Sequence, residues 1–263
     1  WWLPIEIQVE EESKDAAAAF SKVVPAHCQP VNMDSLWNAP VTAIFKNEYL
    51  TPRSPYTTLQ LPKQGIGEWC HPKTTAVIDD SGLRKKVRNQ LFATPFGVNF
   101  RTPSEGNNIA FTSLWDNYPD SIRVPLTGSA SHAYLLMAGS TNHMQCHIVN
   151  GIVKVHYTDG SCDSLELINP ENWCPIEQDF FVDNVAFGIK APRLYRVHLL
   201  SGLVSNNLEK DLTIKGVYGR EIPGGAGVLL DMPLNPKKTL SHLTLETLSN
   251  DVVIGLMSIT LQQ

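Results

Sequence analysis

The sequence predicts an all-β protein, an antiparallel β-sandwich of the jelly-roll type. Short runs rich in apolar and β-branched residues recur from residue 108 onward, and turn-forming residues separate them, as in sandwiches and jelly rolls. Among these runs, Asn150-Gly151 and Asp159-Gly160 fit two-residue hairpin turns, because both dipeptides tolerate a positive φ. The strands that these turns would join into an antiparallel meander are 145–149, 152–157 and 162–167.

The first part of the chain is predicted to be an appendage followed by a loop-rich cover. Residues 1–29 combine an alternating strand pattern with an alanine-rich segment of helical propensity, and are assigned to a linker or remnant. Residues 30–263 are assigned to the sandwich domain. Up to residue 101 this domain is rich in proline and turn residues, with short strands predicted at 41–45 and 56–61. Such loops either cover a sandwich or carry its site.

The remaining strands are predicted from apolar runs between turn residues. Nearly every residue of the last run is apolar, which predicts a central strand covered on both faces. Gly255 inside that run predicts a bulge or the close approach of another segment. The strands predicted outside the meander are 109–113, 120–124, 133–138, 179–189, 194–200, 227–231, 240–248 and 252–261.

Composition narrows the classes of function. A chain of 263 residues can form one large sandwich with a sizeable core. A net charge of -5 without a Lys/Arg run argues against nucleic acid or an anionic membrane as partner, and no apolar run approaches the about 20 residues of a membrane span. Five cysteines without a CxxC pair favour neither a disulfide framework nor structural zinc. The start at Trp1 is compatible with a removed secretion signal, so a periplasmic or extracellular location is expected.

The segment LWDNYPDS, residues 114–121, is the first candidate site. Exposed Trp115 and Tyr118 beside Asp116 and Asn117 would suit a sugar, because C–H faces pack on aromatic rings while short polar side chains bond the hydroxyls. The alternative is a loop whose aromatic side chains fold back and cap the end of the sandwich.

The segment NPENWCPIEQDFF, residues 169–181, is the second candidate. Glu177 and Asp179 are two positions apart, so on a strand they would share a face and could act as a carboxylate pair or bind a cation. Trp173 would add an aromatic surface for a ligand. The alternative is a charged, solvent-exposed face beside a tryptophan buried under a loop.

The segments GEWCHP and IDDSG, residues 67–72 and 78–82, form the third candidate. Trp69 and His71 could line a second aromatic ligand surface. The adjacent Cys70 and His71 have no second ligand pair nearby, so zinc is not expected. Asp79 and Asp80 could give oxygen ligands to a structural calcium ion. The alternative is an Asx turn that leads into SGLRKK.

Several long stretches together carry a resemblance to a known family. They are YLTPRSPYTTLQLPKQGIGEWCHP, IDDSGLR, NNIAFTSLWDNYPDSIRVPL, SHAYLLMAGSTNHMQ, NPENWCPIEQDFF and SNDVVIGLMSITL. With them the chain resembles, over residues 34–261, a domain-of-unknown-function family of gut bacteria, whose long members end in such a β-domain after a glycosidase-like region. The stretches 124–141 and 252–261 also look like galactose-binding jelly-roll modules of polysaccharide-degrading enzymes. The resemblance implies an accessory domain, and it supplies no established catalytic residues that could be carried over to this chain.

These observations lead to three functional hypotheses. The first is a non-catalytic accessory module that binds carbohydrate in a polysaccharide-degrading system. The second is a structural module that packs against a partner catalytic domain, and the third is a glycoside hydrolase that uses Glu177, Asp179 or Asp116 as acid and base. No cofactor is expected beyond the possible calcium ion. The residues expected to line the ligand surface are Trp115, Asp116, Asn117, Tyr118, Trp69, His71, Trp173, Glu177 and Asp179.

Overall fold

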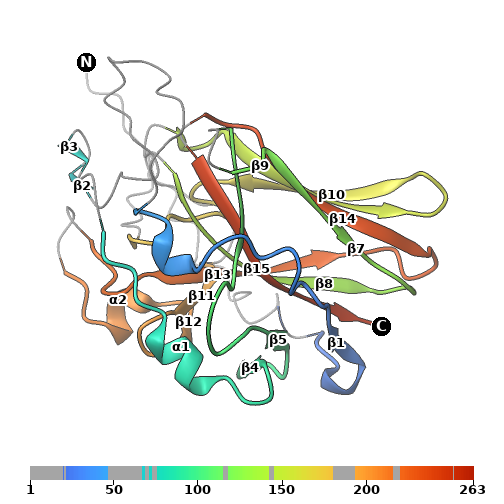
Figure 1. Cartoon of the computed structure of the whole chain (residues 1–263), viewed down its shortest axis with the longest axis horizontal. Coiled ribbons are helices and arrows are strands. Elements are labelled where there is room, and N and C mark those ends of the chain that lie inside the picture. The colour runs from blue at the N-terminus through green and yellow to red at the C-terminus, as the bar shows by residue number, and fades with distance from the viewer. Residues whose placement is uncertain are drawn as a thin grey trace, which may run out of the picture.

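A computed structural model shows two antiparallel β-sheets packed face to face (Figure 1). It describes residues 20, 22–46, 76–114, 118–141, 145–179, 193–215, 220–250 and 252–263, and the backbone alone of 67–68 and 71–72. The all-β class predicted from the sequence is therefore confirmed. Among the described residues, no helix is long and apolar enough to cross a membrane.

One sheet has four strands and the other has seven. The four-stranded sheet has the order β10 (Cys162–Ile168), β9 (Val149–Tyr157), β14 (Leu240–Thr247), β7 (Ser121–Pro125). The seven-stranded sheet has the order β1 (Cys28–Pro30), β15 (Val252–Gln262), β8 (His132–Thr141), β13 (Ala226–Pro233), β11 (Tyr195–His198), β12 (Leu203–Ser205), and β6 (Ala110–Ser113) pairs with β15.

The strand order is that of a jelly roll. Along the seven-stranded sheet the order is β6-β15-β8-β13, and along the four-stranded sheet it is β7-β14-β9-β10. Apart from the hairpin of β9 and β10, consecutive strands of these eight lie in different sheets, and together they form the two Greek keys of a jelly roll. The other three strands extend the seven-stranded sheet, with β11 and β12 beyond β13 and β1 on β15.

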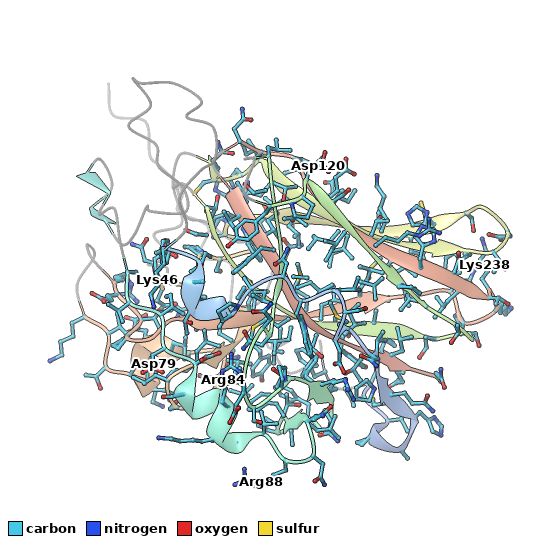
Figure 2. All side chains as sticks on the ribbon, viewed as in Figure 1. Lys46, Asp79, Arg84, Arg88, Asp120 and Lys238 are labelled. Atoms are coloured by element: carbon cyan, nitrogen blue, oxygen red, sulfur yellow. The ribbon has the colours of Figure 1, made fainter. Side chains whose placement is uncertain are left out.

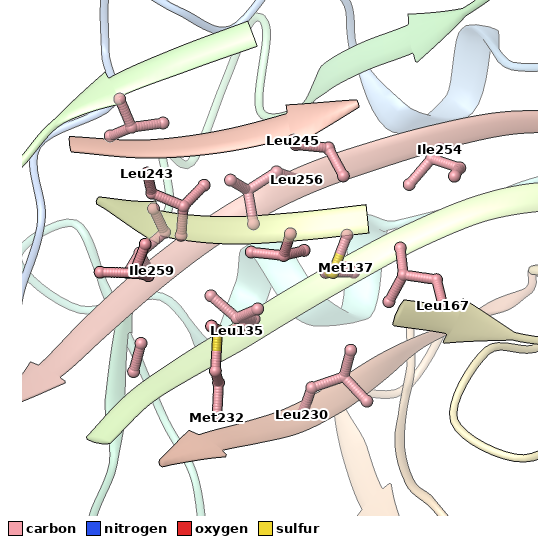
Figure 3. Packing of buried hydrophobic residues seen from close by; sticks show 14 of the residues in the cluster. Leu135, Met137, Leu167, Leu230, Met232, Leu243, Leu245, Ile254, Leu256 and Ile259 are labelled. Carbon is pink, nitrogen blue, oxygen red and sulfur yellow. The ribbon is translucent and has the colours of Figure 1, made fainter. Parts of the chain in front are cut away.

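The main core fills the space between the two sheets. Most of its side chains are aliphatic, and most come from the inward faces of the two sheets (Figure 3). Leu135 and Met137 of β8 lie opposite Leu243 and Leu245 of β14, and all four are fully buried. Because strand side chains alternate, the other residues of β8 and β15 point to the far face of the seven-stranded sheet.

A second core covers that far face. Tyr134 and Leu136 of β8 pack there in one cluster with Ile44, Leu83 and Phe100, which come from the N-terminal part of the chain. Every residue of β15 is consequently buried, which confirms the prediction of a central strand covered on both faces. The loop-rich N-terminal part, where the structure describes it, covers the sandwich.

The remaining elements are short. They are the 3-10 helices η2 (Pro25–His27) and η3 (Val41–Ala43), the helices α1 (Ser81–Lys86) and α2 (Leu208–Asp211), and the two-stranded pairs β2 (Gly67–Glu68) with β3 (His71–Pro72) and β4 (Leu91–Ala93) with β5 (Asn99–Arg101). The strand predicted at 41–45 is wrong, because Val41 begins a 3-10 helix and its amide donates to Asn108 Oδ1 at 2.9 Å. The strand predicted at 56–61 lies outside the described residues, as do residues 1–19 and 21 of the appendage predicted at 1–29 and all of the strand predicted at 179–189 except Asp179.

The prediction of a hairpin turn at Asn150-Gly151, the first turn of the meander, is wrong. Asn150 and Gly151 lie inside β9, which pairs with β14 and not with residues 145–149. Asn150 is buried, and its Oδ1 accepts a 2.8 Å hydrogen bond from Thr141 Oγ1. A Cβ at Gly151 would come within 2.3 Å of Ile254 Cδ1, so glycine serves a close approach there. Packing inside the sheet therefore explains why asparagine and glycine occupy these two positions, and they do not form a turn.

The second hairpin and the special role of Gly255 are confirmed, although the turn is not the predicted two-residue type, because Gly160 has a positive φ and Asp159 does not. β9 and β10 pair from His156 and Cys162 onward, and Gly160 in the connection has φ 85°. A Cβ at Gly255 would lie 2.4 Å from Ile109 Cδ1. That close approach explains why an otherwise apolar central strand contains a glycine.

Candidate functional site

Five of the nine residues predicted to line the ligand surface lie where the structure gives no side chain. Trp115, Asp116, Asn117 and Trp69 lie outside the described residues. His71 is described only by its backbone, which pairs in β3 with β2. Of the sugar-binding surface predicted at residues 115–118, the structure therefore describes only Tyr118.

Tyr118 folds back onto the sandwich. Its ring centroid lies 5.1 Å from that of Phe111 on β6, and the residue packs against the second core. A half-buried ring in this position caps the end of the sheet, as the alternative for this loop predicted. Only part of the ring is available to a ligand.

Trp173 is a core residue. Its side chain is completely buried in the cluster between the sheets, and its ring lies against Gly139, where an added Cβ would come within 2.8 Å. The expectation that Trp173 lines a ligand surface is wrong, because no ring face reaches solvent. The alternative of a tryptophan buried under a loop is correct.

Glu177 lies in a connection that extends the seven-stranded sheet. The amide of Ile176 donates to Gly139 O on β8, and the carbonyl of Glu177 accepts from the amide of Ile222. This places the Glu177 side chain, 1% exposed, beside Ser140, whose Oγ donates to Glu177 Oε1 at 3.0 Å. Burial raises the pKa of Glu177 to about 8. The carboxyl group is therefore neutral at pH 7, and the expectation of a charged, solvent-exposed face is wrong at this residue.

Asp179 has different partners from Glu177. Its Oδ2 accepts from Arg220 Nη2 at 3.2 Å, and the same nitrogen lies 3.3 Å from Glu209 Oε2 on α2. The Arg220 side chain is only 2% exposed, so a buried guanidinium contacts two carboxylates that are themselves more exposed. The two predicted acids thus serve separate structural contacts, one with a hydroxyl and one with a guanidinium.

Asp79 and Asp80 directly precede α1, and Asp80 is its N-cap residue; Figure 2 labels Asp79 and Arg84 in this region. Asp79 Oδ1 accepts from the Ser81 amide at 2.8 Å, which is the predicted Asx turn. Asp80 Oδ2 accepts from Arg84 Nε and from Asn108 Nδ2, both at 2.8 Å. These contacts give both carboxylates structural roles. Among the described residues, no group of three His, Cys, Asp or Glu side chains could hold a metal ion.

The outer face of the four-stranded sheet carries a group that the sequence analysis missed. While Val153, Val155, Leu243 and Leu245 point into the core, the residues between them point outward. The register brings together four basic side chains from β7, β9 and β14. We call them the cationic patch; they are Arg123, Lys154, His156 and His242.

The two histidines of the cationic patch stack on each other. His156 and His242 are register partners, their ring centroids lie 4.3 Å apart, and the rings are within 7° of parallel. Arg123 Nη2 lies 3.1 Å from His242 Nδ1, and Thr244 Oγ1 lies 3.2 Å from His156 Nε2. The alternation of polar residues in 152–157 and 240–248 was visible in the sequence, but the pairing of the two strands was not.

No protein-family model matches the chain, and no curated protein matches its sequence. The resemblance to a domain-of-unknown-function family therefore stays a prediction.

Proposed function

We propose that this protein is a structural jelly-roll subunit, which functions by assembling with further protein subunits, its own copies or related jelly rolls. The observation that carries the proposal is that side chains fill the interior of the jelly roll. Aliphatic side chains fill the space between the sheets, and N-terminal residues cover the far face of the seven-stranded sheet. We therefore expect the outer surface to make the contacts on which the function depends.

The strand order supports this proposal by analogy. Jelly rolls of two Greek keys are found as building blocks of virus shells, in lectins and in cupins. A ligand site inside the barrel would need the space that Leu135, Met137, Leu243 and Leu245 occupy here. Fold alone does not decide function, but a solid interior fits a shell-type building block better than a protein with an interior ligand.

Exposed apolar residues give a second line of support. Ile148 and Leu248 are 47% and 45% exposed. Both lie at the same end of the four-stranded sheet, where the amide of Leu248 donates to the carbonyl of Asn150. Single exposed apolar residues are ordinary, whereas neighbouring ones favour a protein contact.

The carbohydrate-binding module expected from the sequence remains the second proposal. It now depends on Trp115, Asp116, Asn117, Trp69 and His71, because Tyr118 is half buried and Trp173 is fully buried. The same pure protein can test both proposals.

Light scattering coupled to size exclusion, with negative-stain electron microscopy, measures assembly of the full chain from dilute to concentrated solution. A structural subunit is expected to form larger particles of regular shape as concentration rises. A chain that stays monomeric throughout, and that binds a glycan on an array until Trp115→Ala removes the binding, would overturn the structural proposal and establish the carbohydrate-binding one.

A further inference from the structure

We propose that the cationic patch on the outer face of the four-stranded sheet binds an oxyanion, a phosphate or sulfate group. Arg123, His156 and His242 are the residues that would hold it. This inference does not depend on the proposed assembly of the chain.

The fold itself places these groups together. His242 of β14 is opposite His156 of β9, and in the next outward row Thr244 is opposite both Lys154 of β9 and Arg123 of β7. Directly opposite residues on one face have Cβ atoms about 5 Å apart. A ligand the size of a phosphate group can therefore touch side chains from three adjacent strands at once.

The charges of the patch lack a full set of counterions. Lys154 Nζ lies 3.8 Å from Glu246 Oε2, so this lysine has an acidic neighbour. Arg123 instead contacts an imidazole nitrogen, and no carboxylate of the described residues pairs with it. From β10, the residues opposite His156 and Lys154 are Cys162 and Ser164, both uncharged in their ordinary states. On this face of the described strands the acidic groups are Glu246 and Glu166, in the row next to that of Arg123 and Lys154.

The hydrogen bonds of His242 indicate which of its ring nitrogens carries the proton. Arg123 and Ser241 Oγ both approach His242 Nδ1, at 3.1 and 3.0 Å. An arginine can only donate, so Nδ1 accepts and the neutral ring carries its proton on Nε2. Burial, with the nearby charges of Arg123 and His156, lowers the pKa of His242. A bound anion would favour the protonated ring and reverse this effect.

The chemistry of the patch suits oxyanions with several oxygens. A guanidinium gives a fork of N–H donors that matches phosphate geometry. Thr244 adds a hydroxyl group, and protonated imidazoles add N–H donors together with charge. Since proton binding and anion binding support each other, the affinity should rise as the pH falls through the titration of the histidines.

The test is an NMR titration of the histidine ring signals in the full-length protein, with inorganic phosphate and inorganic sulfate as probes and chloride at equal ionic strength as reference. We expect each oxyanion to raise the pKa of His156 and His242, and to bind more tightly at pH 5.5 than at pH 8. Arg123→Gln should weaken binding about tenfold, as expected for the loss of a charge-assisted contact. Lys85→Gln is the matched control, because Lys85 is an exposed cation of α1, beyond the seven-stranded sheet.

A second arm separates a free ion from a group carried on a glycan. Sulfated dextran is compared with unsulfated dextran, again with both variants. Binding of the inorganic ions supports a site for a free anion, and binding of sulfated dextran alone supports a glycan-borne group. Histidine pKa values that do not respond to any probe, or a response that is equal in Arg123→Gln and in the original protein, would overturn the proposal.

Discussion

The buried carboxyl group of Glu177 should make the stability of this protein fall as the pH rises from 5 to 8. The folded protein has a Glu177 pKa of about 8, against an ordinary value of 4.5. A carboxyl group whose pKa is raised on folding stabilises the fold fully below its unfolded pKa. That stability is lost progressively as the pH rises through the folded pKa. Glu177→Gln keeps the shape of the side chain and removes the titration.

The environment of Glu177 explains why ionisation is costly. Ser140 Oγ bonds one carboxyl oxygen, while the other, Oε2, is buried without a partner among the described residues. Arg196 is the cation that lowers this pKa, but its guanidinium donates to the carbonyls of Gln178, Pro175 and Ala226. A charge on Glu177 would therefore remain poorly compensated in a buried site.

The size of this stability loss follows from the linkage between proton binding and folding. Each pH unit between the two pKa values costs about 1.4 kcal/mol of unfolding free energy. From pH 5 to pH 8 the original protein should thus lose about 4 kcal/mol relative to Glu177→Gln.

Urea-induced unfolding of both proteins, followed by tryptophan fluorescence at several pH values, measures this difference. Glu166→Gln on β10 is the control, because the Glu166 side chain is exposed on the outer face of the sheet. Parallel stability profiles for Glu177→Gln and the original protein between pH 5 and 8 would refute the reasoning.

Three further predictions concern single contacts. Ser140→Ala should lower the unfolding free energy by about 1 kcal/mol at pH 6 in urea titrations, because it removes the hydrogen bond to Glu177; unchanged stability would contradict a role for that bond. Gly255→Val should cost at least about 2 kcal/mol, since even a Cβ would lie 2.4 Å from Ile109 Cδ1, and an unchanged melting temperature would show that β15 has room there. Leu248→Asp should weaken self-association about tenfold without changing the melting temperature, because Leu248 is 45% exposed; light scattering that matches the original protein would exclude this end of the sheet as a contact.

The sequence predicted the strands of the sandwich well, because their signals are local. In β15 nearly every residue is apolar, and the structure buries all of them between two cores. The turn at Asp159-Gly160 was equally clear, since the two strands it joins are adjacent in the chain. The same reasoning failed at Asn150-Gly151, where a buried side-chain hydrogen bond and a close approach from Ile254 require these residues inside a strand.

The candidate site was harder to predict because its chemistry depends on what surrounds each residue. Glu177 and Trp173 have residue types that suit binding or catalysis, yet the fold buries both side chains. Nothing in the local sequence distinguishes a buried tryptophan beside a glycine of another strand from an exposed one. The distinction depends on contacts between residues far apart in the chain.

The cationic patch is the opposite case, because the fold brings together basic side chains that no local sequence motif predicts as a group. His156 and His242 are separated by 86 positions in the sequence, but β14 lies between β9 and β7 and so brings the two histidines and Arg123 into neighbouring rows. In a jelly roll, strands that are adjacent in a sheet are seldom adjacent in the chain. Surface sites on such a sheet therefore depend on topology, and reading one from sequence requires the strand order first and the residue types second.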